Sequence, residues 1–214
     1  MNWLNLKLGK ILGINLMICT LLLSGCSSDN KSNEETNTLT NQSNENNQVS
    51  ESEKQNEEAK RKAEEAEAAK QLTSGKVIET TNAEIKFVDA KFSTKVEPDD
   101  TSGSYLYYEA DSDEIFLDLK FEVKNTGKYE LGLDGLVSNV LAEYGDGYIY
   151  QNYSCFWGEN PQDISNVYSW DKLDPLKTAT FHLAVKLPRE VADSQEPLRV
   201  TFKIAGQEQI LNFR

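Results

Sequence analysis

Histidine and cysteine are scarce in this chain of 214 residues, and their scarcity excludes several kinds of chemistry. A structural zinc site uses four nitrogen or sulfur ligands, usually in closely spaced pairs, and the sequence contains no such pairs. A Ser-His-Asp or Cys-His arrangement would have to use the single histidine, His182, and no known catalytic motif flanks it. We therefore expect no catalytic residue, no bound metal and no cofactor.

Basic residues are also few. The sequence has 22 Lys and Arg against 35 Asp and Glu, which gives a net charge of -13. Nucleic acids are bound by clustered Lys and Arg, so the charge excludes them as partners. Acidic residues gather in Glu97–Gly103 and Asp111–Glu114, but neither segment has the register of a calcium loop. We interpret both as solvated loops. A hydrolase that uses these carboxylates as acid and base stays open as an alternative, since a sequence does not show how far apart they lie.

Long apolar runs are missing except at the N-terminus, where residues 11–23 follow Lys7 and Lys10. This run is shorter than the about 20 residues that a membrane-spanning helix needs, and a polar tract follows it. A positive start, an apolar core and small residues before a cysteine are typical of a secretion signal. We interpret residues 1–25 as a signal peptide.

The end of that run, Leu23-Ser24-Gly25-Cys26, resembles the bacterial lipoprotein signal. The resemblance implies that Cys26 becomes the mature N-terminus and carries diacylglycerol, through which the protein would bind the membrane. Two acyl chains hold a protein stably on a bilayer, which predicts lipid anchoring on the extracellular face of the cell membrane. Cleavage would remove Cys19, Lys7 and Lys10, changing the net charge from -13 to -15. Cys155 would then be the one free thiol, and we expect it to be buried.

Between the signal and residue 76 the sequence is polar. Residues 26–56 are rich in Ser, Asn, Thr, Gln and Glu, and such a tract is predicted to be a disordered tether. Residues 57–72 are mostly Ala, Glu and Lys and include the (i, i+4) pair Glu58 and Lys62, which predicts a charged helical spacer. Its apolar side consists of alanine alone, too thin a stripe for a strong coiled coil.

From residue 76 the pattern changes to the alternation of half-buried strands. In Ile115–Lys124 one parity is wholly apolar, with Ile115, Leu117, Leu119, Phe121 and Val123. Asp118 and Lys120 have the other parity and are predicted to face water. His182 likewise has the parity opposite to its apolar neighbours and is predicted to face solvent. The parity changes within residues 83–92, which indicates a β-bulge or a strand that changes sheets. Further strands are predicted at 136–144, 148–153, 178–187, 198–204 and 209–213, with turns at 125–127, 145–147 and 205–207.

About seven or eight short strands without a long amphipathic helix predict an antiparallel β-sandwich over residues 76–214. The segments Ile115–Gly127, Leu173–Lys177 and Ala179–Leu187 resemble the small immunoglobulin-like domains of Gram-positive surface lipoproteins, whose functions are largely uncharacterised. The resemblance implies an all-β, immunoglobulin-like β-sandwich. That family more often has Pro-Gly in the turn before the late strand, where this chain has Lys177-Thr178.

Aromatic residues are concentrated between residues 144 and 170. In the predicted strand 148–153, Tyr148 and Tyr150 share one face and Tyr153 lies on the other, so one tyrosine face is expected to be exposed. Exposed, rigid aromatic side chains are favoured at recognition surfaces. Tyr148, Tyr150, Tyr153 and Trp157 therefore form the predicted binding surface. We expect it to bind an extracellular protein, peptide or glycan without catalysis, and a purely structural role in the envelope is a further alternative.

Overall fold

The computed structural model describes the backbone of residues 45–214 and the side chains from residue 56 onward. The predicted signal peptide, the lipidation site Cys26 and most of the predicted tether lie outside these residues. Helix α1 covers Glu45–Lys70, so it begins before the predicted boundary at residue 57 and includes residues assigned to the tether. Elongating an existing helix costs little for residues such as Glu, Gln and Lys, which explains the longer helix. None of the described helices has a stretch long and apolar enough to cross a membrane.

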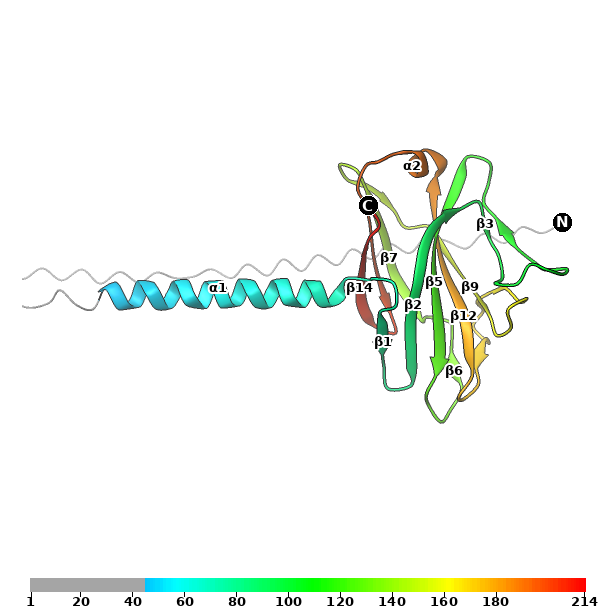
Figure 1. The fold of residues 1–214 in the computed structure, drawn as a ribbon, viewed down its shortest axis with the longest axis horizontal. Helices are drawn as coiled ribbons and strands as arrows, with labels where there is room; N and C mark the ends of the chain where they lie inside the picture. Colours follow the sequence, from blue (N-terminus) through cyan, green and yellow to red (C-terminus); the bar gives the residue numbers. More distant parts are fainter. Residues whose placement is uncertain (1–44) are drawn as a thin grey trace, which may run out of the picture. The chain divides into compact units, whose positions relative to one another are not determined.

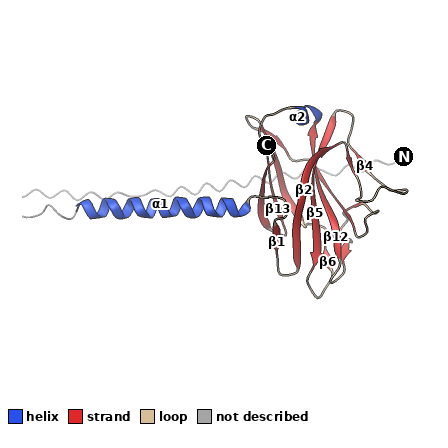
Figure 2. Ribbon diagram, viewed as in Figure 1, coloured by secondary structure: helices blue, strands red, loops and turns tan. Residues whose placement is uncertain are grey.

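Two antiparallel sheets lie face to face (Figures 1 and 2). The six-stranded sheet has the order β1 (Val77–Glu79), β2 (Ala83–Ser93), β5 (Glu114–Asn125), β12 (Thr178–Pro188), β9 (Tyr153–Gly158) and β10 (Ser165–Asn166). The four-stranded sheet has the order β14 (Gln207–Asn212), β13 (Leu198–Ile204), β7 (Val137–Tyr144) and β8 (Tyr148–Tyr150).

Shorter elements complete the domain. Strands β3 (Lys95–Val96) and β4 (Tyr108–Glu109) pair with each other, as do β6 (Leu131–Gly132) and β11 (Lys172–Leu173). Helix α2 (Arg189–Asp193) follows β12.

The strand order confirms the predicted immunoglobulin-like β-sandwich. In such domains strands A, B, E and D form one sheet, and G, F, C and C′ form the other. The order β2-β5-β12-β9 matches the first sheet when the strands are taken in chain sequence, and β14-β13-β7-β8 matches the second.

The core between the sheets comes from the alternation recognised in the sequence. Leu117, Leu119, Phe121 and Val123 of β5 are all fully buried in it. The ring of Phe121 lies 5.4 Å from that of Phe87 on β2 and 6.1 Å from that of Phe202 on β13, so it joins the two sheets. This confirms the predicted inward parity of β5.

Two further predictions about the strands have opposite outcomes. The β2–β5 register shifts between Phe87 and Asp89, which confirms the predicted bulge. The predicted single strand 148–153 is wrong, because β8 ends at Tyr150 in one sheet and β9 begins at Tyr153 in the other. Gln151 and Asn152 carry the chain between the sheets, and a short crossing of this kind interrupts the alternation only briefly.

The solvent-facing positions predicted for Asp118 and His182 are also wrong, since the two residues are only 3% and 4% exposed. Residues 94–110, here called the covering segment, fold back over the outer face of β5, β12 and β9. A second apolar cluster forms there, made of Val96, Phe116, Phe156, Ile164 and Ala184. Alternation correctly indicated that both side chains point to the outer face of the sheet. The covering segment packs over this part of the outer face and excludes water from it.

The turn before β12 lies earlier in the sequence than the family comparison indicated. The amide of Lys177 donates to the carbonyl of Asp174 at 3.2 Å, and Leu176 has a φ of 65°. Pro175 and Leu176 thus occupy the central positions of a type II turn, where the second residue is usually glycine. The exposed leucine holds a backbone conformation that disfavours a side chain.

Candidate functional site

A groove of about 570 Å³ opens at the β10 edge of the six-stranded sheet. It lies between the covering segment and the connection from β9 to β10. Its volume falls within the range of small-molecule binding sites. The lining residues are Ser104, Tyr105 and Leu106 on one side and Trp157, Gly158, Glu159, Asn160, Gln162, Asp163, Ile164 and Ser165 on the other.

A tight connection between β9 and β10 forms one wall. The chain turns back so closely that a Cβ atom on Gly158 would overlap the carbonyl oxygen of Asp163. The amide of Asp163 donates to the carbonyl of Asn160 at 3.0 Å, and Asn160 Nδ2 donates to Asp163 Oδ2 at 2.7 Å. Glycine at residue 158 is therefore required by close backbone approach, and the wall is braced internally.

The covering segment forms the other wall and is tied to the first. The backbone amide of Asp100 donates to the carbonyl of Pro161 at 2.6 Å, and Gln162 Nε2 donates to Asp100 Oδ2 at 2.9 Å. Hydrogen bonds from Ser102 and from Gln162 hold the pKa of Asp100 below its ordinary value. These bonds hold the two walls of the groove together.

Aromatic side chains in the groove are held by hydrogen bonds at their polar ends. The indole Nε1 of Trp157 donates to Asp171 Oδ2 at 3.0 Å, and the hydroxyl of Tyr105 donates to Glu97 Oε1 at 3.3 Å. The nearby carboxylate of Glu97 also raises the pKa of Tyr105. Leu106 is 69% exposed on the covering segment. The ring of Trp157 packs against the main core, so the groove combines the oriented ring of Tyr105 with the open apolar side chain of Leu106.

The polar lining of the groove carries negative charge and no positive charge. Glu159 and Asp163 contribute carboxylates, Asn160 and Gln162 contribute amides, and no Lys, Arg or His belongs to the lining. Anionic ligands would be repelled by this lining, whereas neutral or cationic ligands that donate hydrogen bonds fit it.

The four predicted binding residues do not form one surface. Trp157 lines the groove, but Tyr148 lies on β8 in the other sheet, where it is 66% exposed and its ring lies 6.2 Å from that of Tyr144. Tyr150 and Tyr153 pack against the main core, and burial raises the pKa of both. The sheet crossing after Tyr150 separates them.

A shallower hollow of about 390 Å³ borders Tyr153. The other residues that line it are Asn139, Val140, Leu141 and Gln151.

Sequence reasoning missed the wall formed by Tyr105 and Leu106. The available signal was an apolar run, Tyr105-Leu106-Tyr107-Tyr108, directly after the acidic stretch that we interpreted as a solvated loop. Four consecutive large side chains are unusual in a solvated loop, because such side chains are generally at least partly buried. Tyr108 indeed packs on Phe156, with ring centroids 4.4 Å apart.

A second exposed group of large side chains lies at the sandwich end that contains β6 and β11. The rings of Tyr168 and Trp170 stack with centroids 4.8 Å apart, and Tyr129 and Leu176 are also exposed. Asn125 organises this end, because its side-chain amide donates to the carbonyls of Tyr129 and Leu173, both at 2.8 Å.

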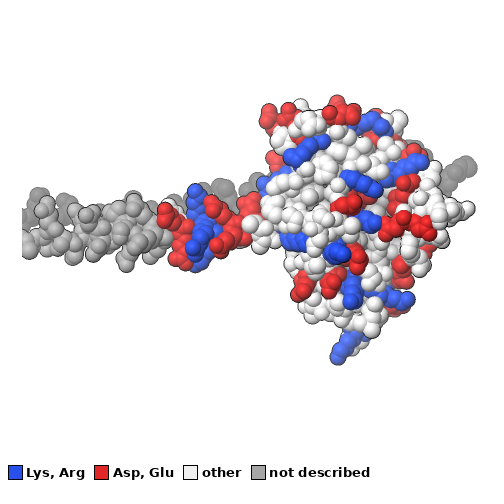
Figure 3. Space-filling model, in the orientation of Figure 1, with Lys and Arg blue, Asp and Glu red and all other residues white. Residues whose placement is uncertain are grey.

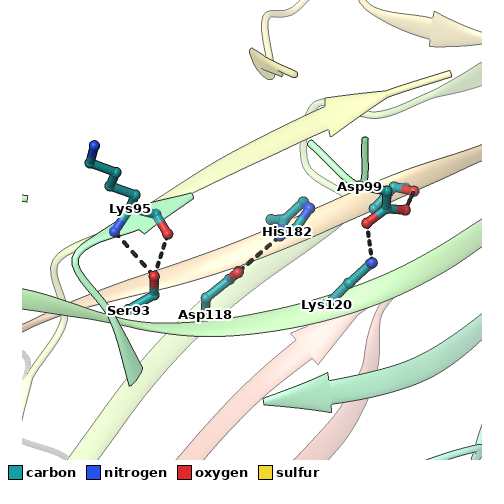
Figure 4. Close-up of polar contacts among 7 residues, drawn as sticks. Ser93, Lys95, Asp99, Asp118, Lys120 and His182 are labelled. Atoms are coloured by element: carbon teal, nitrogen blue, oxygen red, sulfur yellow. Dashed lines mark hydrogen bonds and ion pairs between the residues drawn. The ribbon is translucent and has the colours of Figure 1, made fainter. Parts of the chain in front are cut away.

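The acidic segments form no metal site in the part of the chain that the structure describes, where no group of three or more His, Cys, Asp or Glu could hold a metal ion. Their carboxylates instead have separate partners. Asp99 pairs with Lys120, whereas Glu114 pairs with Lys186 at 2.9 Å and raises the pKa of that lysine (Figure 4 shows the first pair).

The buried histidine pairs with a carboxylate on the neighbouring strand. His182 Nδ1 lies 3.0 and 3.1 Å from the two carboxylate oxygens of Asp118 (Figure 4). Because a carboxylate only accepts hydrogen bonds, Nδ1 carries the proton. Cys155 packs on the opposite face of the sheet, against the main core, and is half-buried. Burial raises the pKa of its thiol to about 12, so these residues do not form a Cys-His dyad.

Comparison with solved structures finds one neighbour that supports the β-sandwich fold. The chain is similar to a crystal structure of an uncharacterised β-sandwich protein from Clostridium difficile 630, with 27% identity and a TM-score of 0.61, over 68% of this chain and 94% of that one. A conserved hypothetical protein from Bacillus anthracis matches with 14% identity and a TM-score of 0.40, over 64% of this chain and 93% of that one. No protein-family model and no curated protein matches the chain significantly.

Proposed function

We propose that this protein is a lipid-anchored surface protein that binds an extracellular or envelope ligand in the groove, without catalysis. The observation that carries the proposal is the groove itself, whose two walls are linked by hydrogen bonds and whose Tyr105 ring is oriented by Glu97. Such preorganisation reduces the entropy cost of binding.

The proposed location rests on the N-terminal sequence, and helix α1 supports it. Side chains of residues 56–69 are exposed on all sides of the helix. A helix that is polar all round typically bridges solvent between other parts of a protein. Its 26 residues span about 39 Å, a length suited to separating the domain from an anchor.

Anchoring is tested with the full chain expressed in a Gram-positive host supplied with an alkyne analogue of palmitate. We expect label in the membrane fraction, and loss of label in Cys26→Ala. Cys155→Ala is the matched control and should keep the label. Mass spectrometry that finds an unmodified, uncleaved leader would overturn the proposed anchoring.

Binding is tested by co-sedimentation with purified envelope from the same host. Residues 48–214 form a compact unit with its own core and provide the soluble protein. We expect that Leu106→Ala together with Asn160→Ala reduces the bound fraction. Tyr129→Ala, which changes an exposed aromatic residue outside the groove, should not. Equal binding by all three proteins would contradict a role of the groove.

A further inference from the structure

We infer that the ligand of the groove is a neutral carbohydrate chain. This inference rests on the proposed function and adds the chemical class of the ligand. It follows from three properties of the groove. Aromatic and apolar side-chain surface is open in it, acceptor oxygens of its lining side chains are exposed, and the neighbouring sheet edge is closed to an added strand.

The first property is the aromatic and apolar surface that the covering segment contributes to the lining, Tyr105 and Leu106. The hydroxyl of Tyr105 is engaged by Glu97, and Leu106 is 69% exposed, so these side chains offer ring and alkyl surface to a ligand. The C–H groups on one side of a sugar ring form an apolar patch that packs on such a surface. Because the Tyr105 ring is already oriented, this packing needs little reorganisation.

The second property is an excess of hydrogen-bond acceptors. Asn160 and Gln162 spend a side-chain N–H on Asp163 and Asp100. Both side chains and that of Glu159 are exposed in the groove, so their acceptor oxygens are open to a ligand. A ligand rich in hydroxyl donors matches these acceptors, and neighbouring hydroxyls can bind the two oxygens of one carboxylate.

The third property separates carbohydrate from peptide. An extended peptide binds a sheet by adding a strand to an edge with free backbone groups. At β10, the backbone amide of Asn166 instead donates to the hydroxyl of Tyr108 at 3.2 Å. The covering segment thereby occupies the place of an added strand.

The charge of the groove separates a neutral chain from a phosphate-bearing one. Phosphate groups are recognised by Lys, Arg or clustered backbone amides. The lining has two carboxylates and no basic side chain, so a polyphosphate or a phosphodiester polymer would be repelled.

The inference is tested by NMR titration of isotope-labelled residues 48–214 with sugar oligomers. The neutral probes are oligomers of N-acetylglucosamine, glucose and mannose, the cationic probe is an oligomer of glucosamine, and the anionic probe is polyphosphate. We expect at least one neutral oligomer to shift resonances of residues 104–106 and 157–165, with an affinity that salt leaves unchanged.

Variants then assign the binding to the groove. Leu106→Ala and Asn160→Ala are expected to weaken binding of the neutral oligomer about tenfold each, which corresponds to about 1.4 kcal/mol. Tyr148→Ala, an exposed aromatic residue on the other sheet, should leave binding unchanged.

Two outcomes would overturn the inference. Binding of the glucosamine oligomer alone, lost at high salt, would assign a cationic ligand. Failure of every neutral oligomer, with groove-dependent co-sedimentation retained, would reject carbohydrate while leaving the proposed function standing. If groove-dependent co-sedimentation also fails, the proposed binding function falls as well.

Discussion

The outer face of the six-stranded sheet has two halves, both formed by the same strands. The covering segment buries one half, called the covered half, and the other, called the open half, is exposed to solvent. On β5, Phe116 and Asp118 lie under the covering segment and are buried, whereas Glu122 and Lys124 share their parity and are exposed. Figure 3 shows basic and acidic side chains interspersed over the side of the domain that faces the viewer. The difference teaches that alternation gives the direction of a side chain, whereas a segment packed from elsewhere decides whether that direction leads to water.

The two halves handle charge differently. In the open half, Lys86 and Glu122 form an exposed ion pair at 4.0 Å, which water also solvates. In the covered half, Asp118 has His182 as its hydrogen-bond partner and little contact with water. A buried carboxylate that loses its partner has no replacement for it, and an exposed one does.

Removing one member of the buried pair should have the largest effect. Asp118→Ala is expected to lower the free energy of unfolding by about 3 to 5 kcal/mol, because His182 would stay buried without its partner. Glu122→Ala, four residues later on the same face, should cost below about 1 kcal/mol. Urea unfolding of residues 48–214 measures both. Similar losses for the two variants would show that the halves do not differ.

The covering segment can be loosened without touching the sheet. Val96 belongs to this segment and is fully buried against the outer face of the sheet, and Val96→Ala is expected to cost about 2 kcal/mol through lost apolar burial and a residual cavity. Hydrogen exchange should then accelerate at the amide of Ala110, which donates to the carbonyl of Thr94. Val77→Ala, on exposed β1, is the control. Unchanged exchange at Ala110 would mean that Val96 does not hold the segment in place.

At β9 both faces of the sheet pack against apolar clusters, and Cys155 lies on the inner face, against the main core. The ionisation of its thiol is therefore a probe of that face. Its thiol has a pKa of about 12 against an ordinary value of 9.0, so between these values the unfolded chain loses the proton first. Stability should therefore fall as pH rises through this window, with a contribution from Cys155 of about 2 kcal/mol at pH 10.5.

The measurement is urea unfolding at pH 8 and pH 10.5 under reducing conditions. Cys155→Ala should show a smaller alkaline loss than the unchanged protein. Identical losses would show that the thiol is solvated and ionises normally in the folded state.

The rim of the covered half should show the smallest effect. Lys120 is paired with Asp99 of the covering segment, yet its side chain is 25% exposed. Lys120→Met is expected to cost below about 1 kcal/mol, and the cost should shrink as salt screens the pair. Lys124→Met in the open half provides the baseline. A large loss of stability in Lys120→Met that does not depend on salt would show that the rim is as shielded from solvent as the buried interior.

Much of the fold was predictable because it depends on neighbours along the chain. The inward residues of β5, the bulge after Phe87 and the glycine turn at 145–147 each follow from alternation or backbone freedom within a few residues. The break between Tyr150 and Tyr153 was not predictable in this way. Alternation continues across it, although the two residues belong to different sheets.

The candidate site was predicted only in part. Trp157 was recognised as one of a concentration of aromatic residues, and it lines the groove. Its opposite wall comes from Tyr105 and Leu106, about fifty residues earlier, directly after a segment interpreted as a solvated loop. Nothing local connects these residues with Gln162, because the hydrogen bond from Gln162 to Asp100 spans 62 positions.

The amino-acid sequence by itself determined the sandwich, since strand periodicity and turn residues act over short distances and leave one apolar face per strand to be buried. Only the tertiary structure decided that Asp118 and His182 are buried and that a groove opens beside β10. Both results require residues 94–110 to return across the sheet, and the free energy of that return comes from contacts between side chains far apart in the chain.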